Sequence, residues 1–111
     1  MNINDLTIGE AKALAAMFAG TPQQNDTAWD IGSIYLIRTV TMIDTGRLVG
    51  ITPQELILED AAWIADTGRF ADALKSCTFG EVEPFPDGRV IVGRGGIIDA
   101  VKIATTQRSK K

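Results

Sequence analysis

Three arginines stand beside glycines where the sequence predicts turns, in the segments Thr45–Arg47, Asp87–Arg89 and Gly93–Gly96. Glycine tolerates positive φ and lets a ligand approach the backbone closely. The guanidinium of the neighbouring arginine offers a planar set of donors that suits a phosphate. The pattern therefore indicates a site for a nucleotide-like anion. The alternative is that each arginine points to solvent or pairs with a nearby carboxylate.

An indole, a guanidinium and a phenyl ring, from Trp63, Arg69 and Phe70, surround an expected strand-to-helix turn. Aromatic faces stack on bases, and arginine binds phosphate or stacks in turn. The alternative is that both rings are core residues and Arg69 is a solvated helix residue. Phe85 is a further candidate for stacking on a base. The predicted ligand-binding residues are Arg47, Trp63, Arg69, Phe70, Phe85, Arg89, Arg94 and Gly95.

The usual catalytic and metal-binding groups are missing from the sequence. There is no histidine and one cysteine, Cys77, which excludes histidine-based catalysis, an intrachain disulfide and zinc sites built from several Cys or His ligands. Glu59 and Asp60 are adjacent on an expected strand, so they should point to opposite faces and make a poor catalytic pair. Asp60 could instead pair with a nearby arginine. We therefore expect a protein that is not an enzyme and that needs no cofactor or metal.

Length and charge limit the class of protein further. The 111 residues predict a single domain, 1–111, and 45% hydrophobic with 23% charged residues is typical of a soluble globular protein. The formal net charge of -3 argues against a general DNA- or RNA-coating surface, so no DNA partner is expected, but a local arginine pocket remains open. No signal peptide or membrane span is recognised. The expected location is the cytoplasm.

The expected fold is α+β, with an N-terminal helix on a small, strongly bent antiparallel β-barrel. Residues 8–19 follow a helical period behind a capping box at Thr7–Glu10. The barrel is expected over 31–103, with an insertion at 61–80. Residues 105–111 are polar and are expected to form a flexible tail.

Turn signals divide the expected barrel into strands. β-branched residues predict a strand at Ile34–Ile43, followed by a hairpin turn at Asp44–Gly46. Strands at Arg47–Thr52 and Glu55–Ile64 complete a meander, and Asp66 or Thr67 is expected to cap a short helix in the insertion. Further strands are expected at 82–85, 89–92 and 97–103, with a turn at Pro86–Gly88.

Two parts of the chain resemble the Sm-like (LSm/Hfq) family. Thr39–Asp60, with its Gly46-Arg-Leu-Val-Gly50 run, is similar to the first family motif, and Val90–Ile98 is similar to the second. The chain departs from the family pattern in the 61–80 insertion and in an extra glycine near Arg94. The resemblance implies an Sm-like barrel, assembly into a ring and binding of RNA.

Three stretches, Thr39–Leu48, Leu58–Phe70 and Val82–Arg94, are similar to small phage and prophage proteins of the Thoeris anti-defence family. That family sequesters cyclic ADP-ribose-type signals, and some members also take cyclic oligonucleotides. The resemblance implies a protein of the host cytosol that traps an immune signal without cleaving it, in pockets between protomers.

The sequence thus leaves three functions open. The first is sequestration of a cyclic nucleotide signal by a homo-oligomer, from dimer to hexamer. The alternatives are an Sm-like RNA-binding ring and a structural or interaction subunit of a phage particle. The acidic charge balance favours the first and third over an RNA-binding ring.

Overall fold

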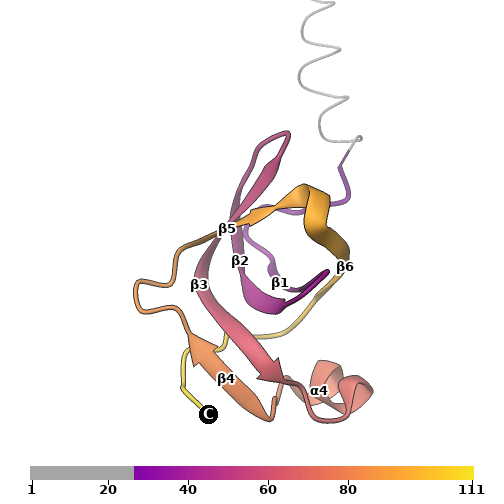
Figure 1. Cartoon of the computed structure of the whole chain (residues 1–111), viewed down its shortest axis with the longest axis vertical. Helices are drawn as coiled ribbons and strands as arrows, with labels where there is room; N and C mark the ends of the chain where they lie inside the picture. Colours follow the sequence, from indigo (N-terminus) through magenta and orange to yellow (C-terminus); the bar gives the residue numbers. More distant parts are fainter. Residues whose placement is uncertain (1–26) are drawn as a thin grey trace, which may run out of the picture. The chain divides into compact units, whose positions relative to one another are not determined.

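The computed structural model describes residues 27–111, so the expected helix at 8–19 lies outside the described residues and the single-domain expectation stays a prediction. Within the unit Ile31–Lys111, one six-stranded antiparallel sheet bends strongly on itself (Figure 1). The elements are β1 (Ile34–Thr39), β2 (Ile43–Ile51), β3 (Glu55–Asp66), α4 (Phe70–Ser76), β4 (Glu81–Pro84), β5 (Val90–Gly93), the 3₁₀ turn η2 (Arg94–Gly96) and β6 (Ile97–Lys102).

The strands run in the order β4-β3-β2-β1-β6, and β5 also pairs with β3. No pairing joins β5 to β6 within residues 27–111, although only η2 separates them along the chain. The expected barrel is therefore a strongly curved sheet that stays open. Its two open sides are β6 at one end and the β4 and β5 strands at the other.

The first hairpin turn lies earlier than the sequence predicts. β1 ends at Thr39, whose amide donates to the Met42 carbonyl at 2.8 Å and whose hydroxyl accepts from the Met42 amide at 3.0 Å. These bonds close a tight turn over residues 40–42. The expected turn at Asp44–Gly46 is wrong, because these three residues lie inside β2.

Gly46 is required by a close approach of two strands rather than by a turn. A Cβ at this position would lie 3.0 Å from the Leu58 Cβ and 3.2 Å from the Ala61 Cβ. Thr45 pairs with Ala62 and Arg47 pairs with Glu59, so two residues of β3 oppose Gly46. This is a β-bulge, and its Asp60 has a φ of 52°. Bulges bend the strand that carries them and increase the local twist.

The bulge also divides the partners of β3. Glu55–Leu58 pairs with β5, and Ala62–Asp66 pairs with β4. Between the two, the Ala61 amide donates to the Gly88 carbonyl at 2.8 Å and the Ala61 carbonyl accepts from Phe85 at 3.0 Å. The predicted turn at Pro86–Gly88 is confirmed, since the Gly88 amide donates to the Phe85 carbonyl and Gly88 has a φ of 80°.

The segment between β3 and β4 is shorter than the expected 61–80 insertion. β3 runs on to Asp66, so the insertion proper is 67–80, and α4 lies within it. The helix is not capped as expected: Arg69 occupies the N-cap position without a side-chain bond, while the Asp66 carboxylate accepts from the Gly68 amide at 2.8 Å. Asp66 thus shapes the turn before the helix.

Both faces of the curved sheet carry buried side chains. Leu36 belongs to a cluster that α4 and the following loop help to cover, with Ala62, Ile64, Ala73, Phe79, Val82 and Ile103. Tyr35 and Ile37 alternate with Leu36 along β1 and therefore lie on the opposite face. The remaining large apolar residues that are buried in the sheet are Leu48, Leu56, Leu58 and Val92.

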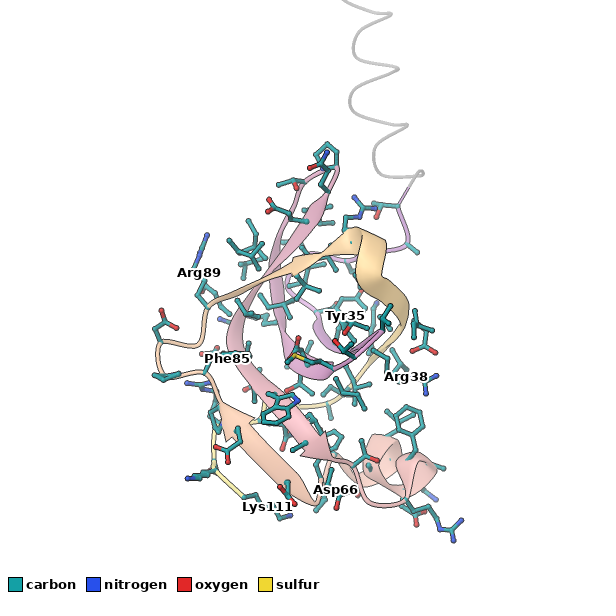
Figure 2. The ribbon with its side chains drawn as sticks, in the orientation of Figure 1. Tyr35, Arg38, Asp66, Phe85, Arg89 and Lys111 are labelled. Carbon is teal, nitrogen blue, oxygen red and sulfur yellow. The ribbon has the colours of Figure 1, made fainter. Side chains whose placement is uncertain are left out.

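The C-terminal segment is bonded to the sheet, in place of the flexible tail expected over 105–111. Lys111 and Val82 exchange two backbone hydrogen bonds of 2.9 Å each, along the open side of β4 (Figure 2). Arg108 donates to the carbonyls of Ala61 and Phe85, where β4 leaves β3. The tail thus extends the sheet and covers the β4 edge, while β5 and β6 remain open.

We expect Gly46→Ala to lower the free energy of unfolding by about 1–3 kcal/mol, because the added methyl overpacks the contact with Leu58 and Ala61. Gly93→Ala is the matched control, since a Cβ there meets nothing within 4 Å. Urea denaturation of both variants measures the difference. Equal stability of the two variants would contradict the close-approach role of Gly46.

Candidate functional site

Arg94 lies at the corner formed by η2, and this corner is bonded to the β2–β3 turn. The Arg94 amide donates to the Gln54 carbonyl at 2.8 Å, and its guanidinium donates to the Thr52 carbonyl at 2.7 Å. The Thr52 hydroxyl in turn accepts from the Glu55 amide at 2.9 Å. The arginine is half-buried and held in place, while its remaining N–H groups can still donate to a ligand.

Gly95 follows at the exposed tip of the same corner. A Cβ there would meet nothing within 4 Å, so the backbone is open on this side. An extended polyanion can therefore approach the main chain next to an anchored guanidinium. Within the predicted residue set, Arg94 and Gly95 are the pair that this geometry best suits for binding phosphate.

Arg47 and Arg89 lie together, but both are paired with carboxylates. Arg47 binds Asp60 and lies 3.9 Å from Glu59. Arg89, which is labelled in Figure 2, lies 3.4 Å from Glu59. The expectation that Asp60 pairs with a nearby arginine is confirmed. The expectation that Glu59 and Asp60 point to opposite faces is wrong, because the bulge at Asp60 interrupts the alternation and both carboxylates reach Arg47. A phosphate would have to compete with these carboxylates for either arginine.

The aromatic residues of the predicted set are dispersed. Phe70 begins α4, and the Arg38 guanidinium lies over its ring at 4.9 Å from the ring centre. Arg69 precedes the helix and is exposed. Trp63 is 39% exposed and lines a cavity of about 440 Å³ with the β1–β2 turn. These three residues do not share the Arg94 corner.

Phe85 lines a second cavity, of about 490 Å³, beside the Arg94 corner. Gly93 and Gly96, which flank η2, line the same cavity, so Arg94 lies between two of its lining residues. Phe85, Arg94 and Gly95 are thus the predicted residues that the structure brings to one region. Arg47 and Arg89 lie at the Glu59–Asp60 cluster, and Arg69 and Phe70 lie at the start of α4. Trp63 lines the other cavity, beside the β1–β2 turn.

Asp44 is a site residue that the sequence analysis missed. It lines the Phe85 cavity, is 6% exposed, and its Oδ1 accepts no hydrogen bond from the described residues. Burial raises the pKa of Asp44 above its usual value, because the charged form loses its hydration. Asp44, Gly46 and the apolar Leu48 are two residues apart and therefore share one face of a strand. This spacing could have placed Asp44 on a buried face, but the prediction of a turn at Asp44–Gly46 concealed it.

The described part of the chain shows few other features that could form a functional site. Residues 27–111 contain no group of three or more histidine, cysteine or acidic side chains that could hold a metal ion. No helix in this range is both long and apolar enough to cross a membrane. Cys77 is half-buried and packs against the cluster that contains Leu36.

Comparison with known proteins supports the fold. No protein-family model and no curated protein matches the chain. Among solved structures, a heptameric archaeal Sm protein matches with a TM-score of 0.51 and 21% sequence identity, over 77% of this chain and 100% of that one. At this identity the match shows the fold alone: the chain has an Sm-like fold. The resemblance to the Thoeris anti-defence family finds no counterpart here, and cyclic-nucleotide binding stays a prediction from the sequence.

We expect Asp44→Asn to stabilise the protein by about 1 kcal/mol at neutral pH, because it removes a buried charge without a partner. The folded-state pKa of Asp44 is raised, so the protonated group favours folding at low pH and this contribution is lost as the pH rises through that pKa. The gain should therefore vanish below about pH 4, the value for an unfolded aspartate. Thermal denaturation from pH 3 to 8 measures it, and a gain that did not depend on pH would contradict the assignment.

Proposed function

From the Sm-like fold, we propose that the chain is the subunit of a homo-oligomeric ring that binds single-stranded RNA. The archaeal neighbour is a heptamer and was described for its implications for the eukaryotic snRNP core, an RNA–protein assembly. The observation that carries the proposal is the Arg94–Gly95 corner, which is bonded to the β2–β3 turn and lies between the open strands β5 and β6. One subunit can then present both the joining edges and the RNA contact.

The two open edges support assembly. Within the described residues, β5 pairs only with β3 and β6 pairs only with β1. Both strands expose large apolar side chains: Ile91 is 57% exposed on β5, Ile98 is 65% exposed on β6, and Val101 is 39% exposed. Unpaired apolar edges readily pair with another chain. Because the edges differ, β5 of one copy would pair with β6 of the next, and such head-to-tail contacts form a ring when the rotation between copies closes.

A ring would repeat the Arg94 corner once per subunit. Repetition matters because a single chain has a formal net charge of -3 and offers no general basic surface. An extended single strand could then contact one anchored guanidinium per subunit around the ring. RNA contact is therefore expected to be local to the corners.

The sequestration of cyclic nucleotides receives less support from the same geometry. Arg47 and Arg89 are paired with Glu59 and Asp60, and Phe70 is in contact with Arg38. These contacts engage three of the residues that the sequence analysis assigned to the ligand. A structural subunit would share the ring assembly but lack RNA affinity, so an RNA-binding measurement separates it from the function proposed here.

Native mass spectrometry should show a closed homo-oligomer, and Ile91→Lys should shift it toward the monomer. The lysine places a charge on the apolar edge of β5, where the neighbouring copy would pair. Val40→Lys is the control, because Val40 is 74% exposed in the β1–β2 turn, outside both edges. An unchanged assembly in the Ile91 variant would rule out β5 as the joining edge.

Fluorescence anisotropy with a uridine heptamer should show binding that weakens steeply as salt increases. We expect Arg94→Ala to weaken binding by about fivefold to tenfold and to lower the salt slope by about one unit, because a phosphate contact is lost. Lys75→Ala removes the same charge from the exposed side of α4 and should leave the affinity within about twofold. The proposal fails if wild-type protein binds no RNA, or if the two variants behave alike.

A further inference from the structure

The cavity beside the Arg94 corner has the composition of a base-binding site. It has a volume of about 490 Å³, which is ample for a nucleobase, and it opens between β5 and the β1–β2 turn. Its walls are largely apolar and include the ring of Phe85. The lining residues are Thr39, Met42, Asp44, Phe85, Val90, Ile91, Val92, Gly93 and Gly96. Ile91 also belongs to the β5 edge that is proposed to join the next copy, so that copy would border the cavity in the ring.

Asp44 is the single charged residue in this lining, and one of its carboxylate oxygens is left without a partner. Its Oδ1 is buried and accepts no bond from the described residues. The neighbouring Thr45 hydroxyl is also buried without a partner, but successive strand residues point to opposite faces, so the two cannot pair. The Thr39 hydroxyl is engaged with the Met42 backbone. An occupant of the cavity can therefore supply a donor for Asp44.

The chemistry of the occupant follows from these groups. A phosphate or another anion is excluded by the carboxylate. A planar aromatic group with hydrogen-bond donors fits the apolar walls, can stack on Phe85 and can satisfy Asp44. A nucleotide brings such a group together with a phosphate, and Arg94 lies along the chain between Gly93 and Gly96, which both line the cavity.

The four RNA bases differ in how well they suit a carboxylate. Guanine presents two adjacent N–H donors on its Watson–Crick edge and can bind both carboxylate oxygens. Adenine and cytosine each offer one amino group beside a ring nitrogen that acts as an acceptor. Uracil offers one N–H between two carbonyl oxygens, which a carboxylate repels. Single-stranded bases are read on this edge when they are unstacked.

We propose that this cavity is a base-recognition pocket that selects guanine in single-stranded RNA, with Asp44 as the acceptor and Phe85 as the stacking surface. The inference rests on the proposed RNA-binding function and adds base selectivity to it. Arg94 contributes affinity that does not depend on sequence, and Asp44 contributes the preference for one base.

Uridine heptamers that carry one central guanosine, inosine, adenosine or cytidine test the proposal. The guanosine oligomer should bind about tenfold more tightly than the all-uridine oligomer, as expected for a bidentate base contact. Inosine keeps the ring N–H of guanosine but lacks its amino group, so it should lose most of this gain. Adenosine and cytidine should bind no more tightly than inosine.

Asp44→Asn is the diagnostic variant, since the asparagine amide cannot accept both guanine donors. It should bind all five oligomers equally, with the salt slope of the wild-type protein. Asp72→Asn removes the same charge from the exposed first turn of α4 and should keep the guanosine preference. Arg94→Ala should bind every oligomer more weakly and also keep the preference.

The outcomes separate this inference from the function on which it rests. Salt-dependent RNA binding without a guanosine preference overturns the base pocket and leaves the RNA-binding proposal intact. A guanosine preference that survives in Asp44→Asn overturns the role of Asp44. The absence of any RNA binding overturns both proposals.

Discussion

The close contact between Gly46 on β2 and the bulged pair Asp60–Ala61 on β3 is the constraint on which the rest of this fold depends. The bulge bends the longest strand and exposes the Ala61 amide and carbonyl to other partners. Those groups bond to Gly88 and Phe85, which separates β4 from β5. Because β5 then pairs with the N-terminal part of β3, it reaches the β2–β3 turn and places Arg94 against that turn.

The arginines of the described segment show how an acidic chain can keep a local anion site. Arg38 pairs with Asp99, Arg47 with Asp60, and Arg89 with Glu59. Arg108 is used differently, because it donates to two backbone carbonyls and holds the C-terminal segment on the sheet. Arg94 also donates to a carbonyl rather than to a carboxylate, so its charge is positioned without being neutralised. This difference makes its corner the strongest candidate for phosphate among the predicted residues.

Short sequence patterns predicted the strands, the helix and the turn whose formation depends on neighbouring residues. The predicted strands after the second turn lie within a residue or two of the observed ones, a short helix does lie in the insertion, and Pro86–Gly88 gave its turn correctly. The first predicted strand, Ile34–Ile43, ran past the end of β1 at Thr39. The errors arose where a distant contact overrides a local signal. Asp44–Gly46 has the composition of a turn, but Gly46 is there because Leu58 and Ala61 pack against it. The mistaken turn also kept Asp44 from being recognised as a buried strand residue. At Asp60 the bulge interrupts the alternation of side chains between the two faces of the strand. Of the predicted site, the structure brings Phe85, Arg94 and Gly95 to one region, and it groups Arg47 and Arg89 around Glu59.

The position of Asp44 connects the stability of the fold with the proposed base pocket. Strand position 44 pairs with Ile37 and lies on the face that also buries Leu48, where an apolar side chain would pack well. A carboxylate without a partner weakens the fold there, because its hydration is lost and no hydrogen bond replaces it. Costs of this kind are commonly found at binding sites, where the missing partner belongs to the ligand. A cavity with an aromatic wall, an unsatisfied acceptor and an adjacent anchored arginine therefore fits recognition of a base better than it fits a packing defect.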